Sequence, residues 1–290
     1  MVVDCLEDAD DTLKIKTLDL LFRMTNKSNV QPIVDKLLEY LQQAPRESKV
    51  REDLVLKIHS LGEKFSPSKT WYVKTMNTLF EMGGDLITHD ICSKFIKVVS
   101  DFEGEAGGEH FRESTIKLYA KILRKKEKVP PAMMTVIAWI MGEHAYTITK
   151  LTKAQRIAED LSIMSYFYYN EGRDQIARSF IIVSVTRLMA RLGFPDNDIV
   201  DNMISDFSRS KELQVQLRCA EYEQIYALKD DLPEDCCLAS TPLNIATVTL
   251  EDFDFKLSFL DEFVAKEEEA GKSKYKSKKR SQIMGEDSFG

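Results

Sequence analysis

The sequence predicts an all-α protein built from repeated pairs of helices. Apolar residues make up 43% of the 290 residues, enough to form an extended core in a chain of this length. Only 12 glycines and 8 prolines occur, so the tight turns of β-hairpins are expected to be rare. Apolar positions recur three and four residues apart over most of the first 229 residues, which is the spacing of a helix with one buried face.

The first helix is predicted to run from Asp10 or Asp11 to about Met24. An aspartate at this place can accept a hydrogen bond from the backbone N–H groups that a helix start leaves unpaired. Leu18, Leu21 and Met24 then form one apolar stripe, and the Asn and Ser residues that follow end the helix. We therefore expect this stripe to be buried.

A second helix completes a pair, and the same plan recurs over the next 40 residues. The pair that follows is predicted over 50–65 and 70–84, separated by a Ser-Pro-Ser turn. In the helix that completes the first pair, the apolar residues have the spacing of a buried face. The residues expected on that face are Ile33, Val34, Leu37, Leu38 and Leu41.

The apolar stripes coincide when the sequence is shifted by 37 residues, and all of the coinciding positions are expected to face the core. Nine positions in three columns match in the first 100 residues. They are Leu18, Val55 and Cys92; Leu21, Ile58 and Phe95; and Met24, Leu61 and Val98. The same offset pairs Ile176 with Leu213, Phe180 with Leu217 and Val183 with Ala220, with Val136, Ile137 and Ile140 at the intermediate place.

A repeat of about 37 to 43 residues is typical of the helix pairs of armadillo and HEAT proteins. Such a pair buries its apolar stripe only by stacking on its neighbours. The sequence therefore predicts an armadillo/HEAT-like α-solenoid with about six helix pairs before residue 230.

Two regions are predicted: a solenoid over 1–229, and a mostly disordered hinge or linker over 230–290. Residues 230–265 carry nine acidic residues and one lysine, whereas 266–290 carry seven basic and five acidic residues. High charge with few large apolar groups does not support a packed core. The first 229 residues sum to about −1, which argues against a nucleic-acid-binding surface, since such a surface is strongly basic.

No catalytic, cofactor-binding or metal-binding residues can be assigned. The four histidines lie far apart, and none has a cysteine or carboxylate at the spacing of metal ligands. Gly271-Lys272-Ser273 resembles the end of a phosphate-binding loop, but Lys266 stands where the loop requires its first glycine, and no strand precedes it. We expect a non-enzymatic protein with no cofactor and no small-molecule substrate.

The compartment is predicted from the cysteines and the N-terminus. Five cysteines show no paired spacing, and no charged-then-apolar signal sequence is present at the N-terminus, as expected for a protein of a reducing compartment. No run of about 18 apolar residues occurs, so no membrane span is expected.

The stretch "LEDFDFKLSFLDEF" places large apolar residues among acidic ones in the predicted linker. One interpretation is a short motif that folds onto a partner's groove. The other is that the same residues fold back and cover the apolar end of the solenoid. The residues concerned are Leu257, Phe259, Leu260 and Phe263.

Three segments of the chain resemble the trunk of the large adaptin subunits of clathrin-type adaptor complexes. The segment at 2–41 fits D-C-L-x-D-x-D-x-T-L-K-x-K-T-x-x-L-L-x-x-x-T-N, although Ala9 stands where many members have proline. The other two lie at 61–85 and around residue 140, where His144 replaces an aromatic residue. The matching residues are Cys5, Leu6, Asp8, Thr12, Leu13, Lys14, Lys16, Leu21, Thr25 and Asn26; Glu63, Lys64, Trp71, Tyr72, Thr75, Gly84 and Asp85; and Trp139, Gly142 and Glu143. "LSFLDEFVA" at 257–265 looks most like the region after the trunk of epsilon adaptin, of adaptor complex 4.

The resemblance implies a subunit of a heterotetrameric vesicle coat adaptor complex, with a beta-type large, a medium and a small subunit as partners. Such complexes sort cargo at the trans-Golgi network, and the subunit would meet cargo and membrane through the complex, on the cytoplasmic side. Large subunits of this family are much longer than 290 residues, so the resemblance also implies a fragment. The alternative is a freestanding armadillo-type scaffold or transport receptor that binds extended peptides. Trp71 and Trp139 are not one repeat apart, which disfavours the Trp and Asn ladder of such receptors.

Overall fold

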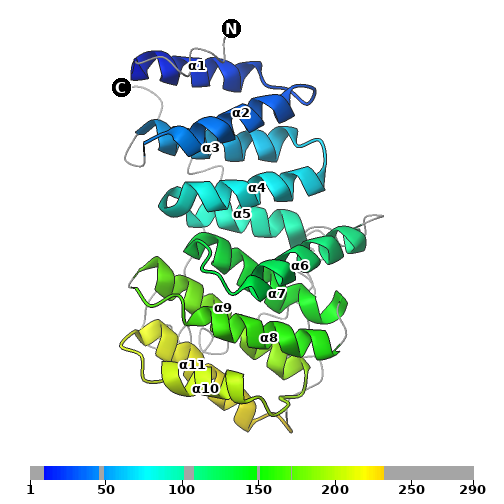
Figure 1. Cartoon of the computed structure of the whole chain (residues 1–290). Coiled ribbons are helices and arrows are strands. Elements are labelled where there is room, and N and C mark those ends of the chain that lie inside the picture. The colour runs from blue at the N-terminus through cyan, green and yellow to red at the C-terminus, as the bar shows by residue number, and fades with distance from the viewer. Residues whose placement is uncertain (1–9, 46–48, 101–107, 149–150, 171, 232–290) are drawn as a thin grey trace, which may run out of the picture. The chain divides into compact units, whose positions relative to one another are not determined.

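The computed structural model describes residues 10–45, 49–100, 108–148, 151–170 and 172–231 (Figure 1). Within these ranges the chain forms eleven α-helices and one short 3-10 helix, with no strand. The α-helices are α1 (Asp11–Met24), α2 (Val30–Gln43), α3 (Lys49–Phe65), α4 (Lys69–Gly83), α5 (His89–Ser100), α6 (Gly108–Lys125), α7 (Pro131–Ile148), α8 (Leu151–Ser165), α9 (Arg173–Arg191), α10 (Asp198–Phe207) and α11 (Leu213–Ala227). The 3-10 helix η2 spans Gly84–Leu86. The all-α prediction is confirmed.

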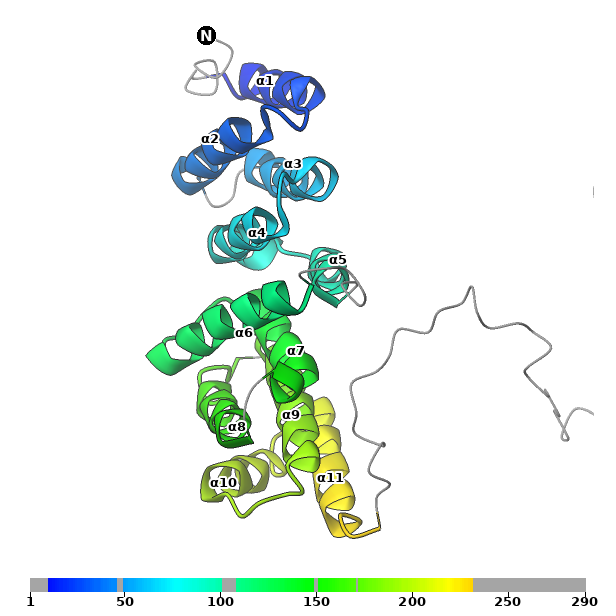
Figure 2. The same ribbon diagram turned by 90° about the vertical axis from the view of Figure 1, so that its right-hand side faces the viewer.

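The helices of the described part stack in two layers. Figure 2 shows α2, α4, α8 and α10 on one side and α3, α5, α7, α9 and α11 on the other. Contacts run within each layer, as between α7 and α9 or α8 and α10, and between layers, as between α2 and α3 or α8 and α9. This is the arrangement of an α-solenoid, in which each pair is stabilised by its neighbours.

Polar caps fix the helix starts that the sequence predicted. Asp10 accepts a hydrogen bond from the backbone N–H of Thr12 at 2.8 Å, and the same bond lowers the pKa of the Asp10 carboxyl. Ser68 accepts one from the backbone N–H of Trp71 at 3.2 Å and so begins α4. The predicted turn between the two helices of the second pair therefore supplies the cap of α4.

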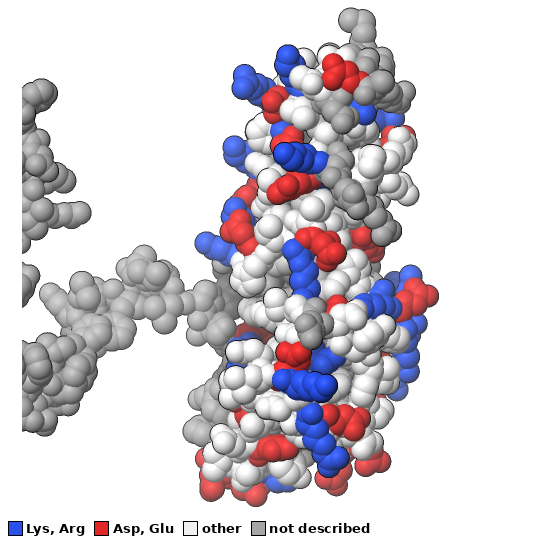
Figure 3. Space-filling model, turned by 90° about the vertical axis from the view of Figure 1, so that its left-hand side faces the viewer, with Lys and Arg blue, Asp and Glu red and all other residues white. Residues whose placement is uncertain are grey.

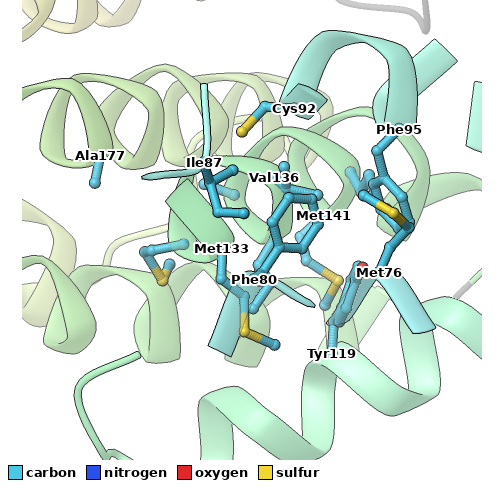
Figure 4. Packing of buried hydrophobic residues seen from close by; sticks show 14 of the residues in the cluster. Met76, Phe80, Ile87, Cys92, Phe95, Tyr119, Met133, Val136, Met141 and Ala177 are labelled. Carbon is cyan, nitrogen blue, oxygen red and sulfur yellow. The ribbon is translucent and has the colours of Figure 1, made fainter. Parts of the chain in front are cut away.

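The predicted stripes form the core of the first helices. Leu18, Val55 and Ile58 are fully buried, and Phe95 packs its ring against the rings of Tyr72 and Phe80. Figure 4 shows Phe80, Phe95 and Tyr119 among methionine side chains where α4, α5, α6 and α7 meet. The expected core residues of α7, namely Val136, Ile137 and Ile140, are buried too.

Three expected core positions of the first half and the later columns depart from the prediction. Met24 is 53% exposed, and Val98 is only partly buried. Ile33 of α2 is also only partly buried, packed against the edge of the core. These residues lie at the borders of their stripes, where the helix surface turns toward solvent.

The later columns lie on the outer side of their helices. Ile176, Leu213 and Leu217 are exposed, and so is Ala220, whereas Phe180 and Val183 are only partly buried. The buried face of α9 lies around the helix from these residues, and in α11 it is narrow. It consists of Ala177, Ile181, Ile182, Val185, Leu188 and Met189 in α9 and of Val215, Cys219 and Tyr222 in α11. The repeat thus predicted which helices match but not which of their faces is buried, because α9 is apolar on more than one face.

Eleven helices give five pairs and one further helix, against about six pairs expected. The structure does not describe residues beyond 231, so the division into 1–229 and 230–290 stays a prediction.

Candidate partner-binding surface

Helix α7 supports the candidate surface and is enclosed by more neighbours than a surface helix. It contacts α4, α5, α6, α8 and α9. Met133 to Ala138 are six consecutive buried residues, more than one full turn of the helix. A helix that is apolar all round is held inside the protein, so α7 positions the residues on its remaining open side with little freedom.

Gly142 allows α7 and α9 to approach closely. A Cβ atom at this position would lie 2.7 Å from Cβ and 2.8 Å from Cα of Ser184. Contacts this short do not occur between real side chains, so only glycine fits unless α9 moves away. The glycine of the adaptin-like segment around residue 140 is therefore a helix-crossing residue.

Glu143 ties α9 to α7 by charge. Its carboxylate accepts a hydrogen bond from Arg187, and Arg191 lies 4.0 Å away. Arg191 also donates to the backbone carbonyls of Gly142 and Glu143, both at 2.9 Å. Glu143 is 2% exposed, and two guanidinium groups lie beside its carboxylate in the interior.

His144 fills a place where the resembling family has an aromatic residue. Burial lowers its pKa to about 4, so the ring is neutral near pH 7. The ring lies edge-on to Trp139, with ring centroids 6.0 Å apart. A neutral imidazole thus occupies the space of an aromatic ring and supports the Trp139 side chain.

A trough runs along the outer side of α9 between α7 and α11. Its volume is about 430 Å³. The floor is α9, and the walls are Trp139 of α7 and two residues of α11. The lining residues are Trp139, Gln175, Ile176, Ser179, Phe180, Val183, Ser184, Arg187, Gln214 and Arg218.

A second hollow of about 220 Å³ adjoins the trough at Ile176. It lies between α5, α7 and the start of α9, where Arg173 donates a hydrogen bond to the Ile87 carbonyl at 2.8 Å. Cys92 lies at its edge as a buried thiol whose pKa is raised to about 11 by burial, so it is not a nucleophile at neutral pH. The two hollows together extend across four helices of one layer, α5, α7, α9 and α11.

The charged side chains that line this surface are all basic. Arg173, Arg187 and Arg218 line the two hollows with His89, and no Asp or Glu is among the described lining residues. Arg187 and Arg218 are partly neutralised by Glu143 and Glu221 beside them. The Arg173 hydrogen bond goes to a neutral carbonyl and leaves its charge in place. The arrangement can bind a ligand with apolar and acidic groups.

The face of the molecule drawn in Figure 3 carries charges of both signs. Lysine and arginine alternate with aspartate and glutamate over the face shown there. Among the described residues, no group of three or more His, Cys, Asp or Glu is placed to hold a metal ion. None of the described helices is both long and apolar enough to cross a membrane.

The structure does not describe the predicted tail motif. Leu257, Phe259, Leu260 and Phe263 lie outside the described residues, and both interpretations of them stay open. Sequence reasoning missed the trough because it assigned Ile176, Phe180 and Val183 to the core. The sequence did contain a signal for the trough, because α9 has a second apolar face. The residues buried on its other face already suffice for the core.

Comparison with known proteins places these features in a family. The family described as "Adaptin N terminal region" matches residues 1–230. The chain is 30% identical over 283 residues to the AP-4 complex subunit epsilon-1 of Homo sapiens, which covers 95% of this chain and 23% of the relative. It is 27% identical over 294 residues to the AP-4 complex subunit epsilon of Arabidopsis thaliana, covering 98% of this chain and 30% of the relative. It is 32% identical over 227 residues to the AP-2 complex subunit alpha-1 of the same plant, and this match covers 77% of this chain and 21% of the relative.

The predicted resemblance to large adaptin subunits, with epsilon adaptin foremost, is therefore confirmed. The chain spans between 21 and 30% of the length of these three relatives. The family match extends over more than half of the chain and over all eleven described helices. The chain belongs to the adaptin family, through the region that the family shares at its N-terminal part.

Proposed function

We propose that this chain is a non-enzymatic part of a large subunit in a heterotetrameric vesicle coat adaptor complex. The adaptin match over residues 1–230 is the observation that carries the proposal. The relatives are named as subunits of AP-4 and AP-2 complexes, and the helical stack gives long surfaces on which other subunits can lie. Its partners would be a beta-type large, a medium and a small subunit.

Within that role, we propose that the complex sorts cargo for transport from the trans-Golgi network. The similarity to two epsilon subunits of AP-4 complexes supports this choice over the other adaptor complexes. The chain would then meet cargo and membrane through the complex rather than by a site of its own. It would lie on the cytoplasmic side of the Golgi membrane and of the vesicles formed there.

Affinity purification tests the assembly. The tagged full chain is expressed in cells, and the medium, small and beta-type large subunits are sought in the eluate. All three are expected. The matched control is Phe95→Asp, which places a charge in the core and should abolish capture. Recovery of none of the three with the native chain, or equal recovery with the control, contradicts the proposal.

Fluorescence microscopy tests the location separately. The tagged chain is expected to give perinuclear spots that overlap a trans-Golgi marker and to lose them when the medium subunit is depleted. Diffuse staining with normal recovery of the three subunits would keep the adaptor assignment and contradict the trans-Golgi one.

A freestanding armadillo-type scaffold is the second candidate, and the positions of the tryptophans count against it. Trp71 lies in α4 and Trp139 in α7, which belong to different layers of the stack (Figure 2). Among the described residues they therefore cannot form one ladder along a groove. This candidate would be favoured if the purified chain bound an extended peptide and affinity purification from cells recovered no other subunit.

A further inference from the structure

The trough along α9 is a surface with more apolar exposure than the fold requires. Ile176 in its floor is 48% exposed, while the core of α9 is already complete on the opposite face of the helix. Contiguous apolar surface rimmed by polar groups is typical of a protein-binding site. Phe180 and Val183 continue the apolar lining of the trough along α9.

The trough has the shape of a groove that can bind a helix. From Ile176 to Arg187 the floor extends eleven residues along α9, about 16 Å at the helical rise. Ile176, Phe180 and Val183 follow one another at helical spacing on that floor, so the apolar path runs parallel to α9. Trp139 forms the wall on one side and Arg218 the wall on the other. A ligand that lies between them has to be narrow and rod-shaped, unlike a flat sheet or a bilayer.

Polar groups lie at both ends and on one wall. Arg173 begins α9 next to Ile176, Arg187 ends the floor, and Arg218 stands on the wall formed by α11. The hydroxyl oxygen of Ser179 is buried in the floor without a hydrogen-bond partner among the described residues. A ligand with acidic residues beside its apolar face would meet these groups with complementary charge.

We propose that this trough binds an amphipathic helix of about three turns from another protein, with its apolar face on α9 and acidic residues toward Arg173, Arg187 and Arg218. A second copy of this chain is a poorer occupant, because a two-fold contact over the trough brings the same arginines of both copies together. The proposal adds a docking site to the chain and does not depend on the identity of the adaptor complex.

The probe for the test is a synthetic stapled helix of about 12 residues with leucines on one face and glutamates on both flanks. Two control peptides replace every glutamate by lysine or every leucine by serine. Binding to the purified full chain is measured by fluorescence anisotropy at low and high salt. The acidic peptide is expected to bind at least about tenfold more tightly than either control, and to weaken as salt screens its charges.

Variants of the chain locate the binding. Ile176→Glu and Gln214→Glu place acids on the floor and on the α11 wall of the trough, and each is expected to weaken binding of the acidic peptide about tenfold or more. Leu56→Glu on α3, where the side chain is 50% exposed, makes the same change away from the trough and should leave the affinity within about twofold. Circular dichroism of all three variants checks that the helices are retained.

Three results would overturn the proposal. One is equal affinity for the glutamate and lysine peptides, which would remove the role of the arginines. Another is unchanged binding by both folded trough variants. The third is a dimer of the native chain in sedimentation that Ile176→Glu alone dissolves, which would assign the trough to a second copy.

Discussion

The first five helices and the last five are held together in different ways. In α2 the five buried residues form one stripe on one face, and the opposite face is polar. In α7 buried residues follow one another around the whole circumference, and in α9 both the inner face and the outer trough carry apolar residues. In the first half α2 is therefore buried on one side only, whereas the second half surrounds α7.

Polar contacts differ between the halves in the same way. Arg51 in the first half reaches backbone carbonyls at the ends of α2 and α4, including that of Met82. In the second half Arg187 and Arg191 reach a buried carboxylate, Glu143. Neutral acceptors fit helices that meet near the surface, while a charge pair in the interior makes the α7–α9 crossing intolerant of change. The comparison can be sharpened by matched substitutions in the two halves.

Glu143→Ala is expected to have the largest effect on stability. It leaves two guanidinium groups beside a buried site without their carboxylate, which costs about 3–5 kcal/mol of unfolding free energy. Urea unfolding followed by circular dichroism measures the change. The control in the first half is Glu39→Ala, where the ion pair with Lys36 spans 2.6 Å but both side chains are half exposed. It should cost less than about 0.5 kcal/mol. Equal losses would mean that the two halves do not differ in this respect.

Gly142→Ala is expected to cost about 2 kcal/mol, because its Cβ would press on the backbone of α9 at Ser184. Gly62→Ala in α3 is the matched change. There the added Cβ meets the Tyr72 ring at 3.4 Å, an ordinary contact, and the better helix propensity of alanine should stabilise by a few tenths to about 1 kcal/mol. The same urea experiment compares them, and destabilisation of similar size in both variants would refute the close-crossing role of Gly142.

The acid stability of the protein should depend on His144. Its pKa is lowered to about 4 by burial, with Glu143 opposing and Arg112 and Arg191 adding to the shift. An unfolded chain takes up this proton near pH 6.5, so stability is full above that pH and falls as the pH drops from 6.5 toward 4. His144→Phe should remove about 2 kcal/mol of the difference in unfolding free energy between pH 7 and pH 4.5.

The remaining acid sensitivity should then come from other groups, among them His59 in the first half. Burial also lowers the pKa of His59, next to Glu63 at 3.7 Å. An unchanged pH dependence in His144→Phe would show that this ring does not titrate as its burial indicates.

Lys57→Met should have the smallest effect of the four, about 1 kcal/mol. Lys57 joins α3 to α1 through Asp19 at 2.9 Å and also pairs with Asp53. Those contacts raise the pKa of Lys57 despite its burial, but both carboxylates are open to solvent and salt weakens the pair. Thermal unfolding at low and high salt should show a difference that shrinks at high salt. A loss comparable to that of Glu143→Ala would contradict the view that the first half lacks interior charge pairs among its described residues.

The sequence by itself determined the class of fold, a solenoid of repeated helix pairs. One-sided apolar spacing is enough for this in helices such as α2, since such a helix has a single face to bury. The caps at Asp10 and Ser68 follow from local chemistry in the same way. The adaptin-like segment around residue 140 was also readable, although what Gly142 and Glu143 do there was not.

Only the tertiary structure decided which face of α9 is buried and therefore where the trough lies. Ile176, Phe180 and Val183 have the same spacing as core residues, and their partners in space come from α7 and α11, more than about 30 residues away in the chain. Hydrophobic burial has no direction of its own, so a helix that is apolar on two faces takes its orientation from the neighbours that pack against it. In this protein those neighbours are set by the contact of Gly142 with Ser184 and by the arginines around Glu143.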